Sequence, residues 1–305
     1  MEITVVVPVY GCRAALMELY RRIKDTIGRI SDEHEIIFVD DCCPQNSWEV
    51  IVEICGMDKK VKGIQMSRNF GQMKAITAGL DASRGNWVVV MDCDLQDSPE
   101  DIANLYKKAQ EGYDIVFSRR KERQDNKLKI WISGLFYKLY SWAADDCFDP
   151  AMSNYCIMKR IVVDNFCKMR EYHRAFTMYL KWLGFHTATI DVNHSTRKEG
   201  KSSYTMKKRI GLAMDIILSQ SDKILKLIVG MGMLVSGLAF LTVILLIIQY
   251  FTMDIEPGWT SIVATTCLIG GLLMTAVGCV GIYVGNIFMQ TKQRPLYVVR
   301  ETINE

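Results

Sequence analysis

The sequence predicts an α/β protein built on a doubly wound, mainly parallel sheet, followed by amphipathic juxtamembrane helices and a two-helix transmembrane hairpin. Three observations predict this class. Short β-branched apolar runs alternate with helical spacing over the first part of the chain, as in parallel sheets covered by helices. Acidic residues follow several of these runs, and two long uncharged apolar segments lie toward the C-terminus.

The soluble part of the chain, expected over residues 1–203, repeats a unit of strand, turn and helix. Each predicted strand is rich in β-branched or aromatic residues, and each predicted helix has apolar residues at helical spacing. The predicted strands span residues 3–9, 35–39, 61–66, 87–91, 114–117 and 185–192. The predicted helices span residues 16–27, 47–55, 72–82 and 99–111.

The apolar run at 87–91 ends abruptly in acid, at Asp92 and Asp94. A short apolar run bounded by polar residues indicates a strand buried on both faces, so both carboxylates lie at the carboxyl edge of the sheet. Two such carboxylates can converge on Mg²⁺ or Mn²⁺, which in turn can bind a diphosphate. The alternative interpretation is that they only end the strand and that 98–100 cap the next helix. An isolated Asp-x-Asp favours this alternative, because the pattern is short and common.

The net charge of +3 hides an uneven distribution. No charged residue occurs from Leu227 to Met253 or from Pro257 to Thr291, and each run exceeds the ~20 residues needed to cross a bilayer. We expect spans at about 224–250 and 259–288, within a hairpin over 223–291. The connecting turn lacks Lys and Arg, whereas basic residues flank the hairpin, so both termini, including a tail over 292–305, are expected in the cytoplasm.

Two further segments are expected to contact the membrane surface. The aromatic-rich stretch at about 125–145 predicts either an interfacial helix or an ordinary core helix. The segment 204–222 carries Lys207, Lys208 and Arg209 beside the first span, which favours a helix on anionic lipid over a solvated charge run. Glycines in both spans allow close helix contact within one chain or between copies, so a homo-oligomer is expected.

No basic segment precedes the first apolar run, so no signal peptide is expected. We expect the ten cysteines to remain thiols, because they form no CxxC pair and the cytoplasm is reducing. No nucleic-acid partner is expected.

Six motifs occur in order along nearly the whole chain. They are Pro8-Val9-Tyr10, Val39-Asp40-Asp41, Ser-Arg-Asn-Phe-Gly-Gln at 67–72, the acidic motif at 91–97, Arg197-x-x-Gly200-x-Ser202-x-Tyr204 and Arg294-Pro295-Leu296-Tyr297. Any one motif is weak, but the ordered set resembles the polyprenyl-phosphate glycosyltransferases. These are inverting enzymes with a GT-A type fold, similar to dolichol-phosphate mannose synthase and to bacterial undecaprenyl-phosphate sugar transferases with two carboxy-terminal spans.

The resemblance implies a role for particular residues. It implies nucleotide contacts from Pro8, Tyr10, Val39, Asp41 and Asp92, metal contacts from Asp94 and Gln96, and phosphate or acceptor contacts from Arg119, Arg197, Ser202 and Tyr204. Catalysis would depend on Asp92, Asp94 and Arg197. The implied cofactor is Mg²⁺ or Mn²⁺.

The chain departs from this family pattern at three places. Gly11-Cys12 replaces an Asn-Glu pair, Cys42-Cys43 replaces Gly-Ser, and Asn154 stands where many members have Asp. A lipid phosphate has its second pKa near ~6 and is already nucleophilic at neutral pH, so the loss of an acid at 154 is tolerable. These departures leave the sugar undetermined.

The predicted function is transfer of a sugar from a nucleotide-sugar, a UDP-sugar being favoured, to a polyprenyl phosphate. A processive polysaccharide synthase would carry a Gln-x-x-Arg-Trp motif and more spans. A non-catalytic scaffold would be expected to lose its acids, yet both aspartates are present. A small transporter would need a polar path, and the spans contain no charge. The nucleotide base and the prenyl length stay open.

Overall fold

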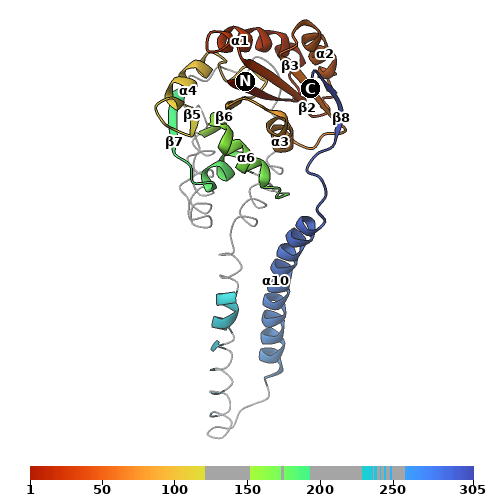
Figure 1. Cartoon of the computed structure of the whole chain (residues 1–305). Coiled ribbons are helices and arrows are strands. Elements are labelled where there is room, and N and C mark those ends of the chain that lie inside the picture. The colour runs from red at the N-terminus through yellow and green to blue at the C-terminus, as the bar shows by residue number, and fades with distance from the viewer. Residues whose placement is uncertain are drawn as a thin grey trace. The chain divides into compact units, whose positions relative to one another are not determined.

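The computed structural model describes residues 1–120, 152–172, 175–192 and 258–305, with scattered residues between 229 and 248 (Figure 1). The chain forms two compact units. The first combines Met1–Tyr137, Phe148–Thr205 and Arg294–Glu305, so both chain ends belong to it. The second combines Lys138–Cys147 and Met206–Gln293.

The first unit is built on an eight-stranded mixed sheet with the order β7-β5-β6-β4-β1-β2-β3-β8. Its strands are β1 (Ile3–Val9), β2 (His34–Asp40), β3 (Val61–Met66), β4 (Trp87–Val90), β5 (Ile115–Arg120), β6 (Met152–Lys159), β7 (Thr187–Val192) and β8 (Val299–Ile303). Pairing is parallel for β1 with β2 and β4, for β2 with β3, and for β5 with β7. It is antiparallel for β6 with both neighbours and for β8 with β3.

Helices cover both faces of the sheet, which confirms the doubly wound α/β prediction. One apolar core joins the sheet to α1 (Leu16–Gly28), α2 (Ser47–Met57) and α4 (Asp101–Ala109). The other joins it to α3 (Gln72–Ala82), α6 (Arg160–Lys168) and α7 (Phe176–Trp182). Strand β1 alternates between them, because Val5 and Val7 enter the first core and Val6 the second.

The antiparallel strands β6 and β8 were not predicted. Strand β6 has the sequence Met-Ser-Asn-Tyr-Cys-Ile-Met-Lys, which lacks the β-branched run of its neighbours. Strand β8, Val-Arg-Glu-Thr-Ile, lies at the end of the sheet, where charged side chains are usual. Residues 292–305, expected only as a tail, thus include a strand of the central sheet.

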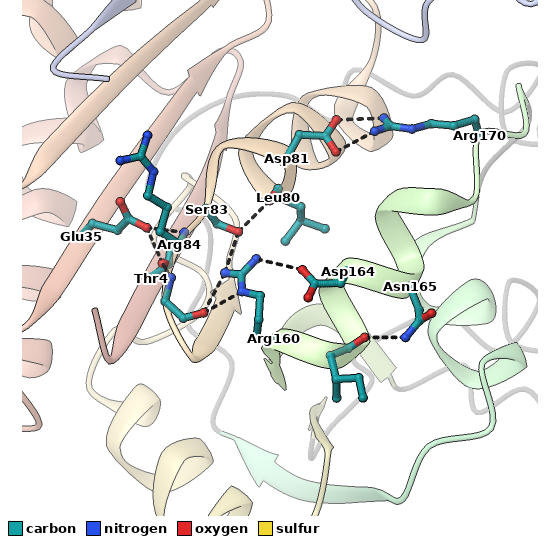
Figure 2. A network of polar contacts seen from close by, with 12 residues as sticks. Thr4, Glu35, Leu80, Asp81, Ser83, Arg84, Arg160, Asp164, Asn165 and Arg170 are labelled. Carbon is teal, nitrogen blue, oxygen red and sulfur yellow. Dashed lines mark hydrogen bonds and ion pairs between the residues drawn. The ribbon is translucent and has the colours of Figure 1, made fainter.

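Polar networks hold the amino-terminal edge of the sheet, opposite the edge that carries the acidic motif (Figure 2). The buried Glu35 carboxylate accepts hydrogen bonds from the Thr4 hydroxyl and the Arg84 amide, both at 2.7 Å, and pairs with Lys62 Nζ at 2.8 Å. The Arg160 guanidinium at the start of α6 donates to the Gly85 carbonyl at 2.7 Å. These contacts connect α6 and the residues before β4 to the first residues of β1, β2 and β3.

The C-terminal residues are anchored in the first unit by side-chain contacts as well as by strand pairing. The Tyr297 hydroxyl donates to the Asp81 carboxylate at 2.6 Å, and the same carboxylate binds both terminal nitrogens of Arg170. The Asn304 amide donates to the carbonyls of Cys55 and Val61, each at 2.8 Å. The segment after the last helix is therefore a structural part of this unit.

In the second unit, α10 (Trp259–Thr291) is the described helix that is long and apolar enough to cross a membrane. Its window Leu268–Thr291 has a mean hydropathy of 2.0 and is not buried by protein. This confirms the second predicted apolar helix. Scattered described residues between 229 and 248 are helical, but most of the first predicted span lies outside the described residues, as do the segments predicted at 125–145 and 204–222.

Candidate functional site

The carboxyl ends of β2, β1 and β4 bring three of the sequence motifs, at 8–10, 39–41 and 91–97, to one edge. These three strands are adjacent and parallel, and Val9 of β1 is in register with Asp40 of β2. Tyr10 follows β1, and Asp41 follows β2. The acidic loop, defined as residues 92–97, follows β4. The predicted convergence of these strand ends is confirmed by the sheet order.

Asp92 and Asp94 of the acidic loop are half-buried and hydrogen-bonded. Asp92 Oδ1 accepts a hydrogen bond from Gln72 Nε2, at the start of α3, at 2.6 Å. Asp94 Oδ1 accepts one from the backbone amide of Gln96 at 3.1 Å. Leu95, which follows Asp94, has a φ of 59°, a left-handed conformation that costs a residue with a Cβ about 1–2 kcal/mol. The loop is therefore held in one specific shape by contacts around it.

Asp41 is buried at the end of β2, and both carboxylate oxygens are engaged by the loop before α3. Oδ1 accepts the Phe70 amide at 2.7 Å and Oδ2 accepts the Gly71 amide at 2.9 Å. Burial raises the pKa of Asp41, while these two amides act in the opposite direction. The structural role of Asp41 was not predicted, and its nucleoside contact stays a prediction.

The other residues assigned to the nucleoside differ in accessibility. Tyr10 is 43% exposed, so its ring is open to a ligand. Pro8 and Val39 are paired across β1 and β2 and are both buried. Because both side chains are buried, a direct nucleoside contact from them stays a prediction.

Arg119 and Asn154 lie farther along the same edge. Arg119 is exposed near the end of β5, while the half-buried Asn154 lies near the start of β6, between β5 and β4. Their neighbours fix the backbone there, because the hydroxyls of Ser118 and Ser153 are hydrogen-bonded at 2.7 Å. The three remaining predicted acceptor residues, Arg197, Ser202 and Tyr204, lie outside the described residues.

A pocket of about 170 Å³ opens beside the acidic loop. It lies between the turn after β1, the start of α1 and the loop itself. The lining residues are Gly11, Cys12, Ala14, Ala15, Glu18, Asp94 and Leu95. Of the two predicted metal ligands, Asp94 and Gln96, it is Asp94 that lines this open pocket.

Cys12 and Cys93 form a disulfide across this edge, with their Cα atoms 6.2 Å apart. The prediction that all cysteines remain thiols is therefore wrong for this pair. Cysteines separated by 81 residues show no spacing signal, so only the folded arrangement of β1 and β4 reveals the pairing. Among the described residues, six cysteines are free: Cys42, Cys43, Cys55, Cys156, Cys167 and Cys279.

The donor chemistry of the acidic loop fits a hard divalent cation, because carboxylate oxygens are the ligands that Mg²⁺ and Mn²⁺ prefer. Within the described part of the chain, no group of three His, Cys, Asp or Glu side chains converges as a complete metal site. Such cations are commonly held by one or two carboxylates together with substrate phosphates. The arrangement thus suits a cation that binds with a diphosphate.

Comparison with known proteins gives full-length relatives. The chain is 34% identical over 99% of its length, and 94% of the relative, to "Uncharacterized glycosyltransferase YkcC" of Bacillus subtilis. It is 32% identical to the "Undecaprenyl-phosphate 4-deoxy-4-formamido-L-arabinose transferase" of Shewanella sediminis, covering 99% of this chain and 92% of that one.

The fold is also similar to a solved structure of glucosyl-3-phosphoglycerate synthase from Mycobacterium tuberculosis, in complex with Mn²⁺, uridine diphosphate and phosphoglyceric acid. The TM-score is 0.50 and the identity 14%, over 71% of this chain and 76% of that one. This likeness concerns the fold alone. The family model "Glycosyl transferase family 2" matches residues 4–180, which include all the described residues predicted for the site. The chain belongs to glycosyl transferase family 2.

Proposed function

We propose that this protein transfers a sugar from a nucleotide-sugar, with a UDP-sugar favoured, to the phosphate of a polyprenyl phosphate such as undecaprenyl phosphate, with inversion. The observation that carries the proposal is the Asp92–Asp94 pair at the carboxyl end of β4, beside the ends of β1 and β2. The name of the Shewanella sediminis relative supports the lipid acceptor.

The acidic loop is proposed to hold Mg²⁺ or Mn²⁺ through Asp94, with Gln96 beside it and Asp92 contacting the nucleotide. When bound, the cation would supply positive charge to the departing diphosphate. The hydrogen bond from Gln72 Nε2 fixes the orientation of the Asp92 carboxylate, which supports this role. The exposed ring of Tyr10 offers a surface for the nucleoside.

The acceptor would approach from the part of the edge that carries Arg119 and, by the family resemblance, Arg197. Guanidinium groups suit this task, because they bind phosphate oxygens in pairs and remain charged. A dianionic lipid phosphate attacking the anomeric carbon opposite the leaving diphosphate gives inversion. Because this nucleophile has already lost its protons near neutral pH, Asn154 need not act as a base.

We further propose that the hydrophobic segment crosses the membrane twice. Strand β8 pairs with β3, so residues on both sides of the apolar region belong to one folded unit. A folded unit lies on one side of a bilayer, and an even number of crossings must therefore separate its parts. With α10 as one span, a second crossing is required within 193–258, in agreement with the predicted span at about 224–250. By the positive-inside rule, the basic residues flanking the hairpin favour a cytoplasmic location for this unit.

Glycines favour close contact of α10 with another helix, either the other span or a second copy. Outside the described residues, Arg197 is proposed to bind the acceptor phosphate, whereas Lys207, Lys208 and Arg209 attach the protein to anionic lipid. Arg197→Lys should therefore lower turnover even at saturating lipid. Neutralising the basic cluster should give a modest, salt-sensitive loss.

The test uses membranes from cells that express the full chain, incubated with radiolabelled UDP- and GDP-sugars and undecaprenyl phosphate. Extraction of a lipid-linked monosaccharide is expected for one donor. Asp94→Asn should lower its formation roughly a thousandfold, whereas Asp25→Asn, at an exposed position of α1, should not change it. Retention of more than about a tenth of the activity by Asp94→Asn would refute the metal assignment.

Two other outcomes would identify the alternative functions. A polymer in place of a lipid-linked monosaccharide would indicate a processive synthase. Nucleotide binding without any product across the donor panel would indicate a scaffold that has kept the fold.

A further inference from the structure

A disulfide joins two loops of the candidate site. Cys12 follows the turn after β1, and Cys93 lies between Asp92 and Asp94 of the acidic loop. Both cysteines are almost buried, at 5% and 7% exposure, but Cys12 and the adjoining Asp94 line the open pocket. A small thiol reagent can therefore approach this pair from the pocket side.

The turn after β1 is anchored without the disulfide. The Gly11 amide donates to Cys43 Sγ at 3.1 Å, and the Arg13 guanidinium binds the Gln45 carbonyl at 3.0 Å and the Glu49 carboxylate at 2.7 Å. When the disulfide is broken, the turn thus keeps its position. The acidic loop is the part that loses a covalent constraint.

That constraint acts on the residues proposed to receive the diphosphate and cation. In the disulfide form, Leu95 is left-handed and Asp94 accepts the Gln96 amide. We expect binding of the cation and diphosphate to shift the Asp94 carboxylate and its backbone from this geometry, even though the second carboxylate oxygen can bind a cation while the first keeps the Gln96 contact. A covalent bond at the neighbouring Cys93 restricts this adjustment.

We propose that Cys12 and Cys93 form a reversible thiol–disulfide modification site, and that the disulfide form transfers sugar more slowly because its acidic loop is fixed. This inference rests on the proposed function. Disulfides inside the cytoplasm are usually transient and redox-sensing rather than structural. The site therefore couples the enzyme to the thiol state of its compartment.

The chemistry is thiol–disulfide exchange with a cellular dithiol. A thiolate of the dithiol attacks one sulfur of the Cys12–Cys93 bond, which breaks, and a mixed disulfide forms. The second thiolate of the dithiol then displaces the remaining cysteine. Two electrons pass to the protein, both cysteines end as thiols after taking up two protons, and the dithiol ends as its own disulfide.

The experiment uses the full chain in detergent, cycled between oxidised and reduced dithiothreitol. Free thiols are blocked, and peptide mapping by mass spectrometry reports whether Cys12 is joined to Cys93. Sugar transfer and Mn²⁺-dependent UDP binding are measured in each state. Cys12→Ser and Cys93→Ser remove the pair, and Cys42→Ser is a matched control, because Cys42 is a free, exposed cysteine of the neighbouring strand end.

Oxidised wild type is expected to transfer sugar at least about fivefold more slowly, the lower end of typical coupling between sites, and reduction should restore the rate. Cys42→Ser should respond like wild type, and the two other variants should not respond. Failure of Cys12 and Cys93 to join under oxidation would overturn the proposal, as would an equal or higher rate in the oxidised form. The cycle on wild type decides the question even if both serine variants fold poorly.

Failure of the proposed function would be recognised separately. If no donor yields a lipid-linked product, the peptide map and the UDP-binding measurement still test the site. Weaker Mn²⁺-dependent UDP binding in the oxidised form would support the constraint on the acidic loop. Equal binding in both states would then refute it.

Discussion

Replacement of Glu35 by Gln tests the buried network at the amino-terminal edge of the sheet. Glu35 is 1% exposed in β2 and pairs with Lys62 of β3, whose side chain is 10% exposed. Burial acts to raise the pKa of Glu35, but hydrogen bonds from Lys62, Thr4 and the Arg84 amide outweigh it and leave the pKa below its ordinary value. The native environment thus favours the charged carboxylate.

Glu35→Gln keeps one oxygen for the Thr4 hydroxyl and the Arg84 amide but turns an amide group toward the Lys62 ammonium. The variant leaves a buried cation without its counter-charge, which typically costs about 3–5 kcal/mol. For a unit of about 200 residues this lowers the melting temperature by roughly 6–20 °C. Adding Lys62→Met should recover most of the loss, because an apolar side chain of similar length removes the uncompensated charge.

The assay is thermal unfolding of the full chain in detergent, followed by circular dichroism. Glu33→Gln is the matched control, since Glu33 pairs with the N-terminal amine but is 77% exposed, and such pairs contribute below about 1 kcal/mol. A lowered carboxyl pKa contributes stability that is present above the ordinary value of 4.5 and is lost as the pH falls through the native value. Wild type should therefore lose more stability below that pH than Glu35→Gln. Equal melting temperatures for Glu35→Gln and Glu33→Gln would refute this reasoning.

Three more predictions concern single contacts. Gly85→Ala would place a Cβ 2.6 Å from the Thr4 hydroxyl oxygen, so thermal unfolding should show a loss of about 1–3 kcal/mol, and wild-type stability would contradict the contact. Tyr297→Phe removes the hydrogen bond to Asp81. It should cost about 1 kcal/mol and speed proteolysis of the C-terminal strand, and unchanged cleavage would argue against this anchor. Gln72→Leu removes the hydrogen-bond donor to Asp92. It should lower sugar transfer about tenfold or more with little change in melting temperature. Unchanged transfer would show that this hydrogen bond does not position the carboxylate.

Much of the central sheet could be predicted, because its inner strands carry an unambiguous signal. Strands β1, β2 and β4 are buried along their whole length, and full burial requires the continuous apolar runs seen in the sequence. Strand β6 carries Ser153 and Asn154 among Met and Cys residues. Its place between β4 and β5 depends on pairing with both neighbours and not on its own composition.

The candidate site was predictable at the level of which residues gather, but not of how they interact. Asp92 and Asp94 were expected at the edge because of the strand that precedes them. That both oxygens of Asp41 bind backbone amides depends on the approach of a loop about 30 residues away. The Cys12–Cys93 disulfide likewise depends on the adjacency of β1 and β4.

The motif at 67–72 now has a physical explanation. Its Phe70 and Gly71 amides bind Asp41 at the end of β2, and the next residue, Gln72, binds Asp92 at the end of β4. Three consecutive residues therefore join two strand ends that are separated in the sheet by β1. Gly71 has a φ of 96°, which a residue with a Cβ rarely adopts, so the backbone can turn between the two carboxylates only with glycine there. The motif fixes the spacing between Asp41 and Asp92, the two carboxylates proposed to contact the nucleotide. A donor that contacts both would meet these carboxylates already in place, and less of its binding free energy would be lost to ordering the protein.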